Sequence, residues 1–145
     1  MKDVLMTGAL LSSALVVEWV VQPPEPERAL AEQVLGPVQR LPMPGAPAFQ
    51  AGNAVMLFFD ETGVQGPLRG AVVVDGGSIR SVIILDARDG PDRQVIQRSG
   101  LADRFRGLPA RPPVVVDAIS GASASSQKVI AAVNRRLKEW QEWPR

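Results

Sequence analysis

The side chains best suited to chemistry gather in one short stretch, which runs from Asp117 to Ser123. Ser120 and Ser123 supply hydroxyl oxygens, and Asp117 supplies a carboxylate. Gly121 and Ala122 carry little or no side chain, so the backbone there can approach a ligand closely. A helical pattern follows, and the free N–H groups of a helix N-terminus favour an anion such as a phosphate. The competing interpretation is that these serines only cap the helix.

The neighbouring segments indicate how this stretch is held. The β-branched run Val114–Val116 precedes it and predicts a buried strand. Arg135, Arg136 and Lys138 fall near the end of the following helix, where cations suit the helix dipole. The apolar face of that helix is predicted from residues at helical spacing, namely Ile130, Val133, Leu137 and Trp140.

The stretch Asp117–Ser123, followed by Ser125, Ser126 and the helical run Val129–Val133, resembles the signature of the FMN-binding domain family. That family includes the C subunit of sodium-translocating NADH:quinone oxidoreductase and the G subunit of the related ferredoxin:NAD complex. The resemblance implies that a flavin transferase esterifies the last hydroxyl of the signature, here Ser123, with the phosphate of FMN. The family usually carries Thr at this position, and Ser offers the same nucleophilic oxygen.

The same resemblance implies a set of cofactor-binding residues around that hydroxyl. It gives Asp117 a role in recognition by the transferase, beside its possible role as a turn cap. The cofactor-binding set is Ser123, Ala122, Gly121, Ser120 and Asp117.

Two upstream segments are also similar to this family. They are the glycine-led hairpin Gly70–Leu85 and the short Phe-x-Gly segment Leu101–Gly107. Between them Asp86–Asp92 stands where the family often has Glu-Thr-Pro-Gly, so the flavin contacts of that loop do not transfer to this chain. The likeness covers Gly66–Trp140. Candidate walls for a flavin ring, each with ordinary core packing as the alternative, are Phe49, Phe58, Phe59, Phe105 and Trp140.

The composition excludes several kinds of site. The 145 residues include no Cys, His or Tyr, which excludes iron–sulfur ligation by thiolates, an ordinary haem site and a structural zinc site. A net charge of +1 gives no indication of nucleic-acid binding. The short pattern Ser125-x-x-Lys128 matches the nucleophile motif of penicillin-recognising enzymes. The chain is too small for that fold and lacks the partner motifs, so we set this interpretation aside.

The N-terminal segment from Val4 to Val21 is an apolar run of about the length that spans a bilayer. Trp19 suits a membrane interface, and Lys2 favours an N-terminus on the cytoplasmic side. A cleaved signal peptide would need small residues before its cleavage site, and the residues around Glu18, at the end of the apolar run, include none. An uncleaved anchor is therefore favoured over a signal peptide or a buried core helix.

The rest of the chain predicts a small mixed domain. A short helix is expected over Glu27–Leu35, followed by a stiff Pro-rich tether or strap over Gly36–Asn53. Beyond it we expect a strand, a turn, a hairpin, a short helix and a tail whose Trp143 is available to a partner. Their bounds are Ala54–Phe59 for the strand, Asp60–Gly63 for the turn, Ala71–Val74 and Ile79–Leu85 for the hairpin, and Val95–Phe105 for the helix.

Taken together, these features predict an α/β (α+β) fold with a small antiparallel sheet and a C-terminal helix, preceded by one transmembrane helix. The expected parts are an anchor over residues 1–22, a helix and linker over 23–53, and an FMN-binding domain over 54–145. The expected function is electron transfer by covalent FMN on Ser123, in a membrane redox complex at the periplasmic side of the inner membrane. Expected partners are other subunits, the bilayer and a flavin transferase. The alternative is a structural subunit that keeps the fold without flavin.

Overall fold

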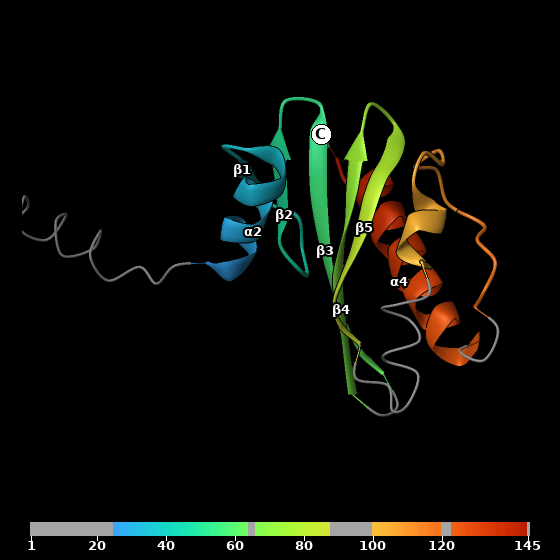
Figure 1. Ribbon diagram of the computed structural model, residues 1–145. Coiled ribbons are helices and arrows are strands. Elements are labelled where there is room, and N and C mark those ends of the chain that lie inside the picture. The colour runs from blue at the N-terminus through green and yellow to red at the C-terminus, as the bar shows by residue number, and fades with distance from the viewer. Residues whose placement is uncertain (1–24, 64–65, 88–99, 120–122, 145) are drawn as a thin grey trace, which may run out of the picture.

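Five antiparallel strands in sequence order form the centre of the molecule (Figure 1). The computed structural model describes residues 25–63, 66–87, 100–119 and 123–144. Its helices and strands are α2 (Pro26–Leu35), β1 (Gln39–Leu41), β2 (Ala48–Ala51), β3 (Ala54–Gly63), β4 (Gly66–Asp75), β5 (Ser78–Ala87), the 3-10 helix η1 (Ala102–Phe105) and α4 (Ser123–Glu142). An antiparallel sheet with a C-terminal helix confirms the α+β prediction for this part of the chain.

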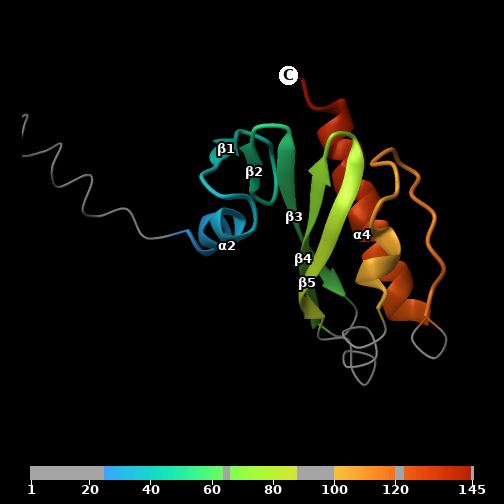
Figure 2. The same ribbon diagram turned by 45° about the horizontal axis from the view of Figure 1, so that its top comes forward.

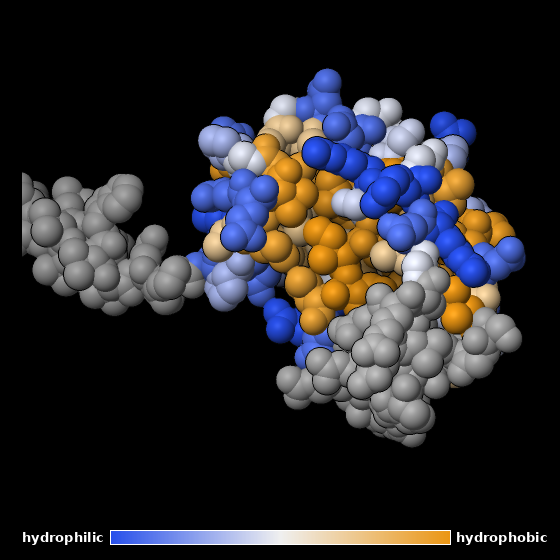
Figure 3. Space-filling view, in the orientation of Figure 1, coloured by the Kyte–Doolittle hydropathy of each residue, from blue (hydrophilic) through white to orange (hydrophobic). Residues whose placement is uncertain are grey.

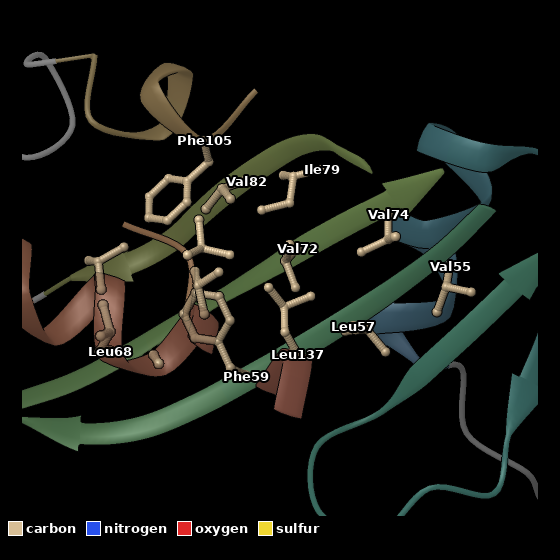
Figure 4. Close-up of a cluster of buried hydrophobic side chains, with 14 of the residues drawn as sticks. Val55, Leu57, Phe59, Leu68, Val72, Val74, Ile79, Val82, Phe105 and Leu137 are labelled. Carbon is tan, nitrogen blue, oxygen red and sulfur yellow. The ribbon is translucent and has the colours of Figure 1, made fainter. Parts of the chain in front are cut away.

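Helices cover the two faces of the sheet separately, as the turned view in Figure 2 shows. Helix α4 and η1 lie on one face and α2 lies on the other. Burial of apolar side chains on both faces is the main force that holds these layers together. Figure 4 shows side chains of β3, β4 and β5 directed toward α4 and η1, with Phe59, Phe105 and Leu137 at the interface.

The segment Gly36–Asn53 is not only a tether, because β1 and β2 both lie within it. Strand β2 pairs with β3 through Ala48↔Leu57 and Phe49↔Met56, and the Phe49 side chain is fully buried. The expectation of a linker is therefore wrong for β1 and β2, which are part of the sheet. The prolines that suggested it lie outside β1 and β2, in the connections, where no ladder hydrogen bond is required.

The predicted turn over Asp60–Gly63 is also wrong, because β3 continues through it and pairs with β4 as far as Gly63↔Gly66. The β4–β5 hairpin is confirmed and is longer on both sides than the sequence indicated. Its turn places Gly76 at φ 60° and Gly77 at φ 85°. Two consecutive positive φ values match the twist of a two-residue hairpin and favour glycine at both positions.

The short helix before Gly36 is confirmed, and its ends follow from the sequence. Pro26 occupies the first turn, where its missing N–H costs nothing. At the other end the N–H of Gly36, at φ 82°, donates to the carbonyl of Glu32 over 2.9 Å. The apolar residues Leu30, Val34 and Leu35 pack against the core cluster on this face of the sheet.

Arg136 ties α4 to the connection between β1 and β2. Its side chain is 4% exposed. One guanidinium nitrogen donates to the carbonyl of Pro44 over 3.2 Å and to Glu139 over 2.7 Å, and the other terminal nitrogen donates to the carbonyl of Ala46. Arg136 was predicted to serve the helix dipole. It also joins two segments that lie about 90 residues apart in the sequence.

Two predictions fall partly or wholly outside the described residues. The expected anchor over residues 1–22 lies outside them, as does the first half of the helix expected over Val95–Phe105. The second half contains the 3-10 helix η1. Within residues 25–144, less the undescribed gaps, we find no helix with the length and apolar character needed to cross a bilayer.

Candidate functional site at the start of helix α4

Ser123 is the first residue of α4, a helix of 20 residues, and it is exposed. No acidic residue lies in the first turn, so the partial positive charge of the helix N-terminus is not neutralised there by a side chain. Ser120, Gly121 and Ala122 lie outside the described residues. The structure therefore places the predicted acceptor hydroxyl on an exposed residue in the first turn of α4.

The first turn of α4 holds the preceding segment through Ser126. The hydroxyl of this buried serine accepts the backbone N–H of Ile119 over 3.1 Å. Ile119 itself is buried among the core residues beneath the helix. This bond fixes the chain at Ile119, the last described residue before Ser120–Ala122.

A second side chain of α4, Asn134, holds the same segment further back. Its carbonyl oxygen accepts the N–H of Val114 over 2.6 Å, and its amide nitrogen donates to the carbonyls of Val114 and Ile130 over 3.0 Å each. The strand predicted over Val114–Val116 is wrong, because these residues have no strand partner in the part of the chain that the structure describes. One side-chain amide satisfies both backbone groups of Val114, which a β-ladder would otherwise do.

A third contact reaches Asp117 from η1. Arg104 donates from its guanidinium group to the backbone carbonyl of Asp117 over 2.8 Å, while the Asp117 side chain is exposed. The cation thus lies beside the segment that leads to Ser123. It adds positive charge on the same side of the molecule as the helix N-terminus, which favours a phosphate group.

These contacts make the region suitable for a phosphate attached through a hydroxyl. Ser123 supplies the oxygen, the first turn of α4 supplies backbone N–H groups, and Ser126 and Asn134 hold the preceding backbone. A bulky, charged group attached at Ser123 can extend into solvent without displacing the core, because the residue is exposed. The residues present therefore fit a phosphoester-linked cofactor.

The family comparison agrees with this geometry. A model of the family described as FMN-binding domain matches residues 63–138, which include β4, β5, η1 and most of α4. The chain belongs to the FMN-binding domain family. A search of curated proteins found no match to this chain.

In this FMN-binding domain protein, the aromatic residues proposed as flavin walls belong to the core. Phe49, Phe58, Phe59 and Phe105 are all buried, and the rings of Phe49 and Phe58 meet edge to face at 6.0 Å. Trp140 and Trp143 are both half-buried and pack against the core. Core packing, the alternative considered for the five candidate walls, is therefore what the structure gives them. Trp143, which was expected to be available to a partner, packs against the same core.

Two residues of the site region were not recognised as such in the sequence. Asn134 follows Ile130 by four residues on α4, so it is a polar side chain on the apolar helix face. That position was the available signal, since a buried polar group needs partners. Arg104 gave no comparable signal, because its contact with Asp117 depends on how η1 packs.

Proposed function

We propose that this protein is a membrane-anchored electron-transfer subunit that carries FMN as a phosphoester on Ser123. FMN bound at this position supplies redox chemistry to the complex. Membership of the FMN-binding domain family supports the cofactor. The observation that carries the proposal is the exposed Ser123 hydroxyl at the N-terminus of α4, with no acidic side chain in the first turn.

In this proposal, different residues of the chain attach and stabilise the FMN phosphate. Ser123 provides the ester oxygen: the new oxygen–phosphorus bond forms as the bond from that phosphorus to the leaving group of an activated FMN donor breaks, and the hydroxyl proton goes to that leaving group. The chain therefore gains the mass of FMN less one water. Backbone N–H groups of the first turn stabilise the phosphate. Gly121 and Ala122 carry little or no side chain, which suits close approach to that group, Ser120 belongs to the same sequence signature, and Asp117 contributes to recognition by a flavin transferase.

The membrane part of the proposal rests on the sequence. The apolar run Val4–Val21 is long enough to span a bilayer, and α2 begins at Pro26, a few residues later. In this proposal the domain lies on the periplasmic side of the inner membrane, where it exchanges electrons with other subunits of a redox complex.

The deciding measurement is the intact mass of the full chain purified from its native membrane, with in-gel flavin fluorescence under denaturing conditions. We expect a mass increase of FMN less one water, located on the peptide that contains Ser123. Ser123→Ala should abolish both signals with an unchanged fold. Ser123→Thr should keep them, because it retains the hydroxyl. Ser78→Ala, at the exposed serine that begins β5, is the matched control and should keep them as well.

Two results would overturn the covalent proposal. One is flavin that stays attached to the Ser123→Ala variant through denaturation. The other is an unmodified wild-type chain in a complex that assembles normally, which would favour a structural subunit that keeps the fold without flavin.

A further inference from the structure

Strand β3 has an edge without a strand partner among the described residues. Strand β2 pairs with β3 only over Ala54–Leu57, whereas β3 continues to Gly63 (Figure 1). On its other side β3 pairs with β4 along its whole length. Unpaired strand edges present backbone donors and acceptors to other polypeptides.

Pro47 marks the point where the pairing with β2 stops. The N–H of Phe58 donates to the carbonyl of Pro47 over 3.0 Å. Pro47 has no N–H to return to the carbonyl of Phe58. Because backbone groups alternate in direction along a strand, the N–H and carbonyl of Asp60 point the same way as those of Phe58. Asp60 therefore presents a donor and an acceptor at the free edge.

A hollow lies on each side of this edge. One, of about 310 Å³, is lined in part by Glu27, Pro47, Phe58, Arg69 and Leu85. The other, of about 160 Å³, is lined by residues of β3 and of α4. Both hollows include Ala46 and Phe58–Asp60 in their lining, so the edge runs between them. A strand added to an edge places successive side chains on opposite faces, and each face here has space for one.

The larger hollow combines apolar walls with negative charge. Figure 3 shows apolar surface on this face between α2 and the strands beside it. Glu27 and Asp60 carry two carboxylates, and both lie near one cation, Arg69, at 3.4 Å and 3.7 Å. The Asp60 side chain is 60% exposed. Such a site suits a Lys or Arg whose methylene stem covers apolar surface while its charge meets carboxylates.

We propose that the β3 edge at Phe58–Asp60 binds an extended segment of a partner protein, with a Lys or Arg opposite Asp60. The backbone of that segment pairs with Asp60, and its basic side chain enters the larger hollow. A second copy of this chain is a poor occupant, because symmetric pairing about Asp60 would set two aspartates directly opposite each other. This surface is separate from Ser123 and does not depend on flavin attachment.

The test uses the full chain in detergent micelles and three synthetic extended peptides. The first has Lys between alternating Thr and Val, the second has Glu in place of Lys, and the third is the Lys peptide N-methylated at the Lys amide. Backbone amide shifts and hydrogen exchange of Phe58, Asp60 and Thr62 report binding. We expect the Lys peptide to protect the Asp60 amide, and the Glu peptide to bind roughly 2- to 5-fold more weakly, as suits an exposed ion pair. The N-methylated peptide should not bind.

Two variants separate backbone pairing from charge. Asp60→Pro removes the edge N–H while leaving the β3–β4 ladder, because that N–H points away from β4, and it should abolish binding of all peptides. Asp60→Asn keeps the N–H and should remove most of the difference between the Lys and Glu peptides. Far-UV circular dichroism checks that both variants fold.

Three results would overturn the proposal. They are no protection of Asp60 at peptide concentrations up to about 1 mM, equal binding of the N-methylated peptide, and protection that rises with protein concentration without peptide. The last result would assign the edge to a second copy of this chain.

Discussion

A single amide side chain, Asn134, replaces a strand partner for the segment that leads to Ser123. It joins both backbone groups of Val114 and the carbonyl of Ile130. A β-branched run such as Val114–Val116 has strand propensity wherever it lies. Whether it forms a strand depends on a neighbouring backbone, and here the neighbour is a helix. Val115 is consequently 81% exposed, which the propensity of the run could not indicate.

Asn134→Ala should lower the free energy of unfolding by about 1–3 kcal/mol, because it leaves the N–H of buried Val114 without its partner. Urea unfolding of the wild type and the variant measures this, and faster hydrogen exchange at Val114 should accompany it. Asn134→Asp keeps the acceptor for that N–H but loses the donor to the carbonyls of Val114 and Ile130 and sets a carboxylate beside them, so it should destabilise the protein as well. Gln127→Ala, at an exposed position of the same helix, is the control. A loss no larger than that of the control would contradict the assigned role.

At the level of elements, helices and hairpins whose pattern lies within one segment of the sequence were predicted correctly. Helix α4, helix α2 and the β4–β5 hairpin each carry their own periodicity or turn residues, and all three are present. Elements that depend on distant partners were missed. Strands β1 and β2 are short and flanked by prolines, and they become strands because β3 offers an edge. Ser123 and Asp117 were predicted from a local signature, whereas Arg104 and Asn134 act through tertiary packing.

The β3–β4 hairpin has no room for a side chain at Gly70. A Cβ at this position would lie 2.5 Å from the ring of Phe59 and 2.5 Å from the carbonyl oxygen of Ile83. Gly70→Ala should therefore destabilise the protein by about 1–3 kcal/mol through overpacking, as measured by thermal or urea unfolding.

A double variant separates the two clashes. Phe59→Leu combined with Gly70→Ala should recover part of the loss relative to the sum of the single variants, because one of the two obstructing groups is removed. The backbone clash with Ile83 should remain. Full additivity of the two single variants would show that the Phe59 ring does not limit the space at Gly70.

For the whole molecule, the folded unit begins before the matched family region. The family model starts at residue 63, yet β2 contributes fully buried Ala48 and Phe49, and α2 contributes Ala31. The apolar area that these residues bury is part of what makes a domain of this size stable. We therefore expect the smallest stable unit to begin near α2.

Two truncated chains test this expectation. A chain that starts at Glu25 should leave the membrane fraction and unfold cooperatively in urea. A chain that starts at Ala54 should lack a cooperative transition, because the core beneath α2 would be open. Hydrogen exchange of the Phe58 and Val73 amides, which belong to that core, measures how far it opens in each of the two chains. Equal stability of the two chains would show that α2, β1 and β2 are dispensable.

The buried contact between Arg136 and the carbonyls of Pro44 and Ala46 imposes an order on biosynthesis. The two ends of this contact are about 90 residues apart in the sequence, so the carbonyls of Pro44 and Ala46 cannot bind Arg136 until α4 has been synthesised. Because Ser123 begins that same helix, prematurely terminated chains would lack a docked acceptor hydroxyl. In the proposed function, the transferase would thus attach FMN only to completed chains, because only these chains present Ser123 on a docked α4.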